Sequence, residues 1–378
     1  MAWSRRAFIG ATAASVAGVT LSTGKATAPV GREKAYGVIE LRLGGMSASV
    51  YRFDLDRIHR RELSGFERMA PALSGKAFAE IELASPLGPA ADDAQAAQSV
   101  EIVAGHIDKL KAQYGLQAKD IAVLVSSGLV DFAPGRVEHF TEELPVRTGI
   151  IPEFVTVKEQ ARLGYDWIVR RTYRDRVMHV DIGSGYIKGG YYGPAGFVDI
   201  AAPYGTKTMA GAVKRRWPDV RTATFGQRSL EFYGDTVGSM LASQIEGEPS
   251  PMQRPELYLT GGIVVATAMI LHPKAILGHH PLVDLAPDDF ARLLGLIAGG
   301  TPYGGPLPSD LTDDEAERAR DGLRRVRNVL NPHEIAAGAA IGDGLARQLR
   351  FDQRTKLILP RLAGTQIWVS QYLLEKFG

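Results

Sequence analysis

Asp181 is followed by a glycine turn, and an acid beside such a turn suits the handling of phosphate. Asp181 lies near the end of the apolar run 177–182, and Gly183 and Gly185 follow closely. Glycine can take up backbone angles that are closed to other residues, which leaves amide groups free to face an anion. The aromatic and β-branched residues of 186–192 predict a returning strand. A purely structural turn between two strands would have the same pattern.

A similar plan occurs near the N-terminus. Residues 35–43 predict a strand, Gly44 and Gly45 a turn, and residues 47–53 a second strand. The plan recurs around Asp181 after about 140 residues, which suggests a duplicated domain. Phosphates would then be held between the two halves.

A third glycine turn follows the strand predicted at 257–259. Thr260, Gly261 and Gly262 stand between this strand and a helix predicted at 263–271. A glycine pair at the start of a helix leaves unpaired amides and the positive end of the helix dipole, which can bind an anion. Close packing of the helix on the strand would require the same glycines, so both interpretations stay open.

The composition is that of an ordinary globular protein. The chain has 378 residues, enough for two domains, with 45% hydrophobic and 23% charged residues. It has no cysteine, which excludes disulfides, thiolate catalysis and thiolate metal sites. The formal net charge of +2 gives no argument for a nucleic-acid partner.

Residues 1–28 have the pattern of a twin-arginine export signal. Arg5 and Arg6 precede the weakly apolar segment 7–21, and small residues at 26–28 would suit a signal peptidase. The apolar segment is too short to span a bilayer comfortably. We therefore expect a periplasmic protein that is exported already folded and has no stable membrane insertion after cleavage. An uncleaved amphipathic anchor is the alternative.

The rest of the sequence alternates between strand and helix patterns, which predicts an α/β protein. Further strands are predicted at 121–125, 154–157 and 357–359. Helices are predicted at 94–113, 158–170, 208–217, 227–245, 313–328, 332–349 and 365–377.

In this order the motifs resemble those of the exopolyphosphatase / guanosine pentaphosphate phosphatase (Ppx/GppA) family, which has the actin-like ATPase superfold. Residues 181–188 stand where the family has D-I-G-G-G-S-T-E, and 159–163 stand where it has E-E-A-R-L. Residues 41–47 align without gaps on the opening I-D-L-G-S-N-S. Residues 260–262 resemble the family's Gly-Gly-Thr turn, and 335–341 its late A-G-A helix.

This resemblance implies two duplicated RNase H-like domains with a cleft between them. We expect the N-terminal domain at 35–172 and the C-terminal domain at 173–378, with the last helix able to return to the N-terminal domain. The implied ligand is polyphosphate or a related phosphoanhydride. Export argues against a free cytoplasmic nucleotide as the substrate.

The residues at the active-site positions depart from the family pattern. Family members hold magnesium with acids of the first and second loops and use a glutamate to activate water. Here Arg42, Gln160 and Lys188 stand at three of the acidic positions, and only Asp181 remains. An amide cannot act as a general base, and two cations in place of acids would repel magnesium. Arginine and lysine could instead neutralise phosphate oxygens.

We therefore predict a phosphoanhydride-binding protein with no metal cofactor. The expected phosphate-binding residues are Arg42, Gly44, Gly45, Ser47, Gly183, Ser184, Gly185, Lys188, Thr260, Gly261 and Gly262. One alternative is an active exopolyphosphatase that uses magnesium, with Asp181, Glu159 and Gln160 as the candidate catalytic residues and Asp181 as the candidate metal ligand. Another is a non-catalytic scaffold or sensor with a vestigial cleft. A homodimer is compatible with each of these functions.

Two other groups of residues could bind ligands. His272, His279 and His280 lie close together in sequence and could bind zinc, although loop histidines are usually solvated. The basic clusters at 170–176 and 214–216 could line a channel for a polyanion, although solvated helix faces have the same composition.

Overall fold

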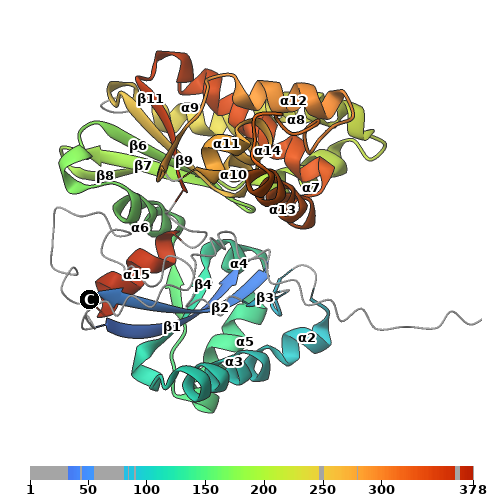
Figure 1. The fold of residues 1–378 in the computed structure, drawn as a ribbon. Helices are drawn as coiled ribbons and strands as arrows, with labels where there is room; N and C mark the ends of the chain where they lie inside the picture. The colour runs from blue at the N-terminus through green and yellow to red at the C-terminus, as the bar shows by residue number, and fades with distance from the viewer. Residues whose placement is uncertain are drawn as a thin grey trace, which may run out of the picture.

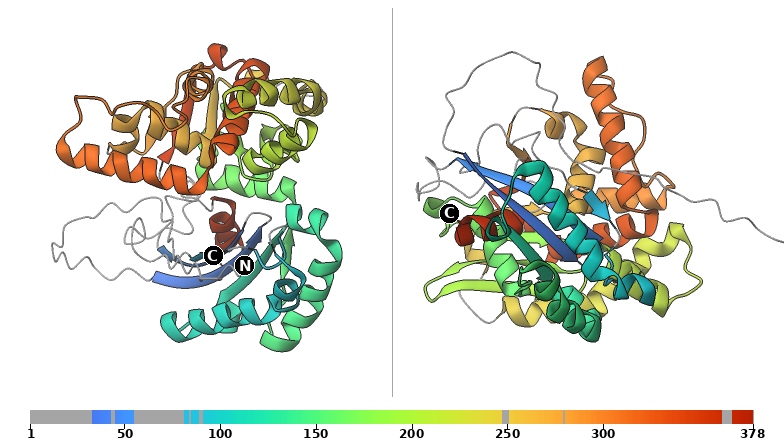
Figure 2. Two further views of the ribbon diagram at one scale, coloured as in Figure 1. Left: turned by 90° about the vertical axis from the view of Figure 1, so that its right-hand side faces the viewer. Right: turned by 90° about the horizontal axis from the view of Figure 1, so that it is seen from below.

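The protein has two halves, each built on its own β-sheet (Figures 1 and 2). The computed structural model describes residues 33–42, 45–54, 81–83, 85–88, 91–246, 251–278, 280–361 and 367–377. The predicted signal at 1–28 and Gly44 lie outside these residues. Among the described helices, none is long and apolar enough to cross a membrane.

The first sheet has five strands in the order β3-β2-β1-β4-β5. Strand β1 pairs antiparallel with β2 and parallel with β4, and it is covered on both faces. Alternate residues therefore enter different cores: Tyr36 and Val38 enter one, and Ile39 and Leu41 enter the other. The strands are β1 (Glu33–Arg42), β2 (Gly45–Asp54), β3 (Ile81–Leu83), β4 (Ile121–Ser126) and β5 (Glu153–Val155).

The second sheet repeats this order and adds one edge strand. Its order is β10-β11-β9-β6-β7-β8, so that β8, β7, β6, β9 and β11 correspond in turn to β3, β2, β1, β4 and β5. The duplicated α/β architecture predicted from the sequence is confirmed. The strands are β6 (Val177–Ile182), β7 (Ile187–Gly193), β8 (Gly196–Ala202), β9 (Glu256–Thr260), β10 (Leu282–Asp284) and β11 (Lys356–Pro360).

In the first half, helices cover the outer face of the sheet. The helix predicted at 94–113 is interrupted at Gln98, which caps the end of α2 and the start of α3. Helix α3 ends at Gly115, whose left-handed backbone (φ 67°) favours glycine. The helices are α2 (Asp93–Ala97), α3 (Ser99–Tyr114), α4 (Ser127–Phe132) and α5 (Pro134–Thr148).

In the second half, helices pack around α14, which is rich in small residues. A Cβ atom on Gly338 would lie 2.6 Å from Ile263 and 2.7 Å from Thr206, so the glycine lets α14 approach α10 and α7 closely. The helix predicted at 227–245 contains a π-helical turn, η5 (Tyr233–Gly238), between α8 and α9. The helices are α7 (Thr206–Arg216), α8 (Thr222–Phe232), α9 (Ser239–Ile245), α10 (Gly262–Leu271), α11 (Pro273–Leu277), α12 (Asp289–Ala298), α13 (Asp313–Val329) and α14 (Pro332–Gln348).

Two helices lie between the sheets and join the halves. Helix α6 (Val157–Ile168) follows β5 of the first sheet but packs against β7 and β8 of the second. Helix α15 (Ile367–Phe377) follows β11 of the second sheet, yet its Phe377 stacks on Tyr36 of β1 with ring centroids 4.6 Å apart. The two helices pack on each other (Figure 1). Each half thus gives a helix to the other.

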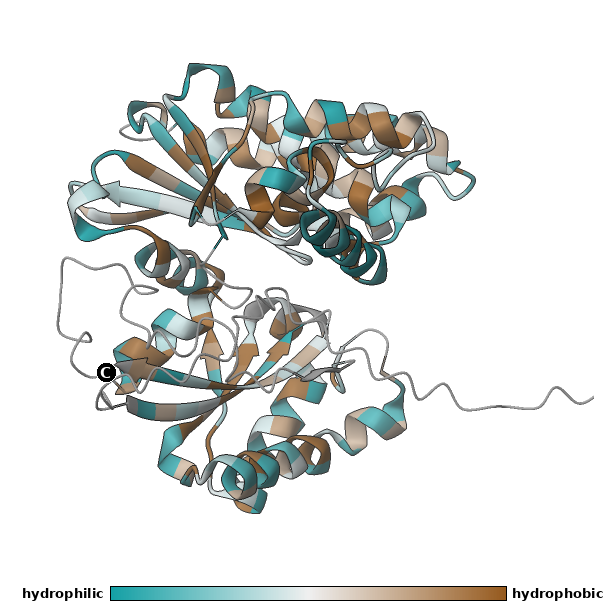
Figure 3. Ribbon diagram, in the orientation of Figure 1, coloured by the Kyte–Doolittle hydropathy of each residue, from teal (hydrophilic) through white to brown (hydrophobic). Residues whose placement is uncertain are grey.

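The apolar residues follow this arrangement. They line the strands and the inner helix faces of both halves, whereas α13 is hydrophilic along most of its length (Figure 3). The inner face of the first sheet, α6, α15 and the second half form one continuous hydrophobic cluster. The outer face of the first sheet has a separate cluster with α3 and α5.

Candidate functional site

Asp181 lies at the end of β6, beside Thr260 at the end of β9. The two residues are paired in the parallel register of these strands. The Thr260 hydroxyl donates a hydrogen bond to Asp181 Oδ1 over 3.0 Å. The sequence predicted both residues for the site, and the structure brings them together.

Lys188 contacts the other oxygen of the same carboxylate. It lies opposite Asp181 in the β6–β7 hairpin, and its Nζ is 3.2 Å from Asp181 Oδ2. Only 14% of the Lys188 side chain and 18% of the Asp181 side chain are exposed. The ammonium group therefore neutralises the carboxylate at short range, in a place largely shielded from water.

A buried histidine supports this pair from within the sheet. His179 Nε2 lies 2.8 Å from Thr260 Oγ1. Since Thr260 donates its proton to Asp181, we assign the Nε2–H tautomer, in which His179 donates to Thr260. Burial lowers the pKa of His179 to about 4; the Asp181 charge opposes this shift, and Lys188 adds to it. A neutral imidazole thus orients the hydroxyl that contacts the acid.

The glycine turn after β6 is bound to the start of α7. Its own ends are joined by a 3.0 Å hydrogen bond from Gly183 N to Tyr186 O. The amides of Thr206 and Lys207 donate to the carbonyls of Gly183 and Ser184, each over 2.9 Å. The first amides of α7 are therefore occupied by the turn and do not face an anion. Gly185 completes the contact, because its carbonyl accepts the Thr208 hydroxyl over 2.8 Å.

Of the two glycines after β9, only Gly261 is required by its backbone conformation and its surroundings. Gly261 has φ 108° and ψ 161°, and a Cβ atom there would lie 2.2 Å from Ile182 O. Both the backbone angles and the close approach require glycine, so Gly261 serves the packing of this turn on β6. Gly262 begins α10, and a Cβ atom there would meet nothing within 4 Å.

The first half also places an acid and a cation at the end of its central strand. Arg42 Nε is 3.5 Å from Glu40 Oε2, and the Glu40 side chain is 2% exposed. Ser47, another predicted site residue, is buried opposite Glu40 in the β1–β2 register. Gly45 begins β2 opposite Arg42. The two halves thus carry comparable pairs, Glu40 with Arg42 and Asp181 with Lys188.

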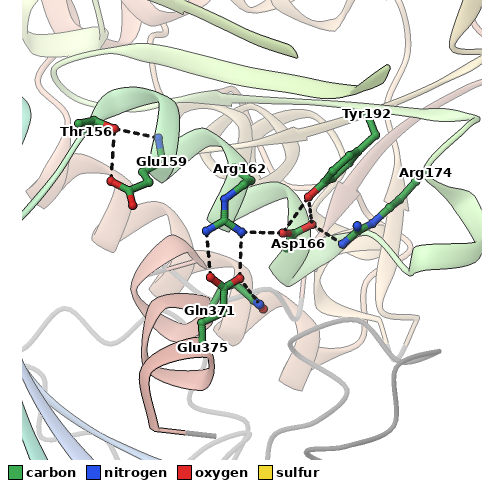
Figure 4. Close-up of polar contacts among 8 residues, drawn as sticks. All are labelled: Thr156, Glu159, Arg162, Asp166, Arg174, Tyr192, Gln371 and Glu375. Carbon is green, nitrogen blue, oxygen red and sulfur yellow. Dashed lines mark hydrogen bonds and ion pairs between the residues drawn. The ribbon is translucent and has the colours of Figure 1, made fainter. Parts of the chain in front are cut away.

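Glu159 and Gln160 have hydrogen-bond partners other than Asp181. Gln160 is buried and donates its side-chain amide to Val155 O over 2.9 Å. Glu159 is exposed in the first turn of α6, where its backbone amide donates to Thr156 Oγ1 over 3.2 Å (Figure 4). The Thr156 hydroxyl also donates to Glu159 Oε2 over 3.4 Å. Glu159 is therefore part of a helix cap.

A segment of the first half that the sequence did not predict lies at the site. Gly128, in α4, is so close to Tyr186 that a Cβ atom would lie 2.7 Å from the Tyr186 ring. Residues 126–128 lie where β4 ends and α4 begins, and β4 corresponds to β9 in the duplicated order. They are thus the counterpart of 260–262, and the internal repeat was the signal that could have found them. We call residues 126–128, 183–186 and 260–262 the strand-end junction.

The residues present do not fit the magnesium ion that the resemblance implies. Both Asp181 oxygens already have partners, and a lysine ammonium lies against one of them. Within the described parts of the chain, no group of three or more His, Asp or Glu side chains is placed to hold a metal. Of the zinc candidates, His272 lies 2.7 Å from Asp289, His280 lies 2.8 Å from Leu282 O, and His279 is outside the described residues.

Two of the arginines that precede β6 are engaged in ion pairs. Arg174 contacts Asp166 over 2.5 Å, and Arg176 contacts Glu256 over 2.8 Å. Tyr192 also donates to Asp166 over 3.2 Å (Figure 4). Burial raises the pKa of Asp166, although its arginine partners oppose the shift. These contacts give Arg174 and Arg176 structural partners of their own.

The ion pairs of Asp166 extend to a contact between α6 and α15. Arg162 of α6 donates to both carboxylate oxygens of Glu375 over 3.0 and 2.9 Å, and to Asp166 over 3.1 Å (Figure 4). Gln371 donates to Glu375 over 3.0 Å. A two-pronged arginine–carboxylate contact fixes geometry as well as charge. The network therefore fixes the packing of the two helices that join the halves.

Several solved structures have a similar fold. A Ppx/GppA family member from Aquifex aeolicus aligns with a TM-score of 0.56 and 14% identity, over 92% of this chain and 99% of that chain. An exopolyphosphatase from Cytophaga hutchinsonii aligns with a TM-score of 0.58 and 13% identity, over 90% and 98%. An exopolyphosphatase-like protein aligns with a TM-score of 0.58 and 14% identity, over 91% and 97%. No family model and no curated protein matches the sequence. The chain has the Ppx/GppA fold, as the motif resemblance predicted.

Proposed function

We propose that this chain, which has the Ppx/GppA fold, binds linear phosphoanhydrides such as polyphosphate at the strand-end junction without hydrolysing them. The observation that carries the proposal is the 3.2 Å contact between Lys188 Nζ and Asp181 Oδ2. A bound divalent cation would neutralise an acid at such a site so that a phosphate can approach. Here a tethered ammonium group does so, and it has further N–H donors for a phosphate oxygen.

Among the residues that the structure describes, the candidate groups for hydrolysis are engaged in other contacts. A general base must lie within hydrogen-bonding reach of the attacking water. Gln160 is an amide bound to the backbone, and Glu159 caps α6. Asp181 is held by Thr260 and Lys188. We therefore infer that the protein kept anion binding and lost the activation of water.

Tripolyphosphate binding, measured by calorimetry with and without magnesium, tests this proposal. The parent protein should bind whether or not magnesium is present, and it should release no phosphate. Lys188→Met keeps an unbranched side chain of similar length but leaves the Asp181 charge uncompensated, so the affinity of the variant should fall at least tenfold without magnesium and recover partly with it. Lys274→Met, which breaks the surface pair between Lys274 of α11 and Asp310, is the matched control. Magnesium-dependent release of phosphate by the parent would refute the proposal.

A scaffold or sensor whose junction takes no ligand is the second candidate. The contact between Tyr186 and Gly128 favours it, because this contact joins the two halves where a ligand would enter. Absence of binding to tripolyphosphate and long-chain polyphosphate in both the parent and Lys188→Met would support the scaffold. Binding by the parent alone would support the first proposal.

We further propose that the protein is exported by the twin-arginine route. Arg5 and Arg6 followed by the weakly apolar segment 7–21 support this proposal. Replacing both arginines with lysine in the full chain should shift the protein from the periplasmic to the cytoplasmic fraction. An unchanged distribution would contradict the proposal.

A further inference from the structure

The side chain of Tyr186 reaches from the second half of the protein to the first. Tyr186 ends the turn between β6 and β7, and its backbone carbonyl is held by Gly183 N over 3.0 Å. Its ring lies against Gly128 of α4, where an added Cβ atom would be 2.7 Å from Cε2 and 3.4 Å from Cδ2. The ring is therefore in direct contact with the backbone of the opposite half.

This contact lies beside the groups that we expect to bind phosphate. Tyr186 is two residues from Lys188 on the same hairpin. On the opposite side, the register of β1 with β4 places Leu41 opposite Val125, so the end of β4 lies next to the Arg42 end of β1. The phenol ring thus bridges the two walls of the strand-end junction.

The contact of the Tyr186 ring with Gly128 leaves no space for another planar group between the ring and α4. Carbon atoms in contact are separated by about 3.5–4.0 Å, so a nucleobase between the ring and α4 would require the walls to separate by roughly that distance. Separation is opposed by the contacts of α6 and α15, which include the Arg162–Glu375 pair and the stack of Tyr36 on Phe377. A slender phosphate chain, which needs no such space, is not opposed in this way.

We propose that Tyr186 determines the ligand class, by excluding phosphoanhydrides that carry a planar base in favour of linear inorganic ones. The inference rests on the proposed function, because it concerns the same junction. Exclusion of a competitor by a side chain that fills its place is a general way to obtain specificity. Tyr186 is in this view a specificity-determining residue, and the ring rather than the hydroxyl carries the effect.

The experiment measures the dissociation constants of tripolyphosphate and of a non-hydrolysable ATP analogue by calorimetry. It compares the parent, Tyr186→Ala and Tyr186→Phe. Tyr173→Ala, which removes a partly exposed tyrosine before β6, is the control. The readout is the ratio of the two constants, since a general loss of structure would weaken both ligands together. We expect the preference for tripolyphosphate to fall at least tenfold in Tyr186→Ala and to be unchanged in Tyr186→Phe and Tyr173→Ala.

The other outcomes separate this inference from the proposed function. If the parent binds tripolyphosphate and Tyr186→Ala keeps the same ratio, the inference is overturned and the proposed function stands. Loss of ATP-analogue binding in Tyr186→Ala would show that the ring supports a base, which also overturns the inference. If the parent and Tyr186→Ala bind neither ligand, both proposals fail. If only Tyr186→Ala binds, and binds both ligands equally, the ring is an unselective block, and both proposals fail again.

Discussion

Mild acid should destabilise this protein through His179. In the unfolded chain a histidine takes up a proton near pH 6.5, whereas folded His179 does so only near pH 4 because it is buried. Between these values the unfolded state binds more protons, so the free energy of unfolding falls as the pH is lowered through this range. The difference corresponds to about 3 kcal/mol below pH 4, with about 2 kcal/mol lost between pH 7 and pH 5.

Urea unfolding at pH 7, 6 and 5 measures this loss. His179→Gln keeps a side-chain N–H for Thr260 but cannot take up a proton, so the parent should lose about 2 kcal/mol more than the variant between pH 7 and pH 5. Burial also lowers the pKa of His106 and His333, but both proteins keep these residues, so their effect cancels. His139→Gln, at an exposed position, should behave as the parent. An equal loss of stability in the parent and His179→Gln would refute the reasoning.

Three further predictions concern the junction and the helices that join the halves. Lys188→Glu places a second carboxylate beside the acid at the end of β6, so magnesium should raise its melting temperature by about 2–4 °C and leave that of the parent unchanged; equal responses would contradict this. Gly261→Ala should lower the free energy of unfolding by about 2–4 kcal/mol in urea, because alanine fits neither the backbone angles nor the space, whereas Gly262→Ala should be nearly neutral. Glu375→Gln removes the charged partner of Arg162 and should reduce the free energy of unfolding by about 1 kcal/mol; an unchanged urea midpoint would contradict that role.

The duplicated architecture could be predicted because it depends on local patterns. Short apolar runs next to glycine turns predicted the paired strands of both halves, and the repetition of this pattern predicted the duplicated domain. Helices whose periodicity is weak or interrupted were harder to predict. Helix α5 (Pro134–Thr148), which contains Pro145, was missed, and the segment 227–245 contains a π-helical turn that no residue pattern announces. Helix α12 (Asp289–Ala298) was also missed, although its apolar residues are regularly spaced.

The site could be predicted less well, because its roles depend on which side chains meet. Sequence placed Asp181, Thr260 and Lys188 at one site, but only the structure shows that Lys188 pairs with the acid. Gly261 was equally compatible with anion binding and with packing, and the 2.2 Å approach to Ile182 O favours packing. The contact of Tyr186 with the first half depends on how the halves are placed, which no local pattern encodes.

The exchange of α6 and α15 has a consequence for how the chain acquires its structure. Tyr36 hydrogen-bonds to the backbone of Phe377, 341 residues further along the chain. During synthesis the first sheet therefore emerges from the ribosome before α15, the helix whose Phe377 packs on its inner face. We therefore expect that neither half forms a stable protein when produced alone, because each half lacks the helix that the other supplies.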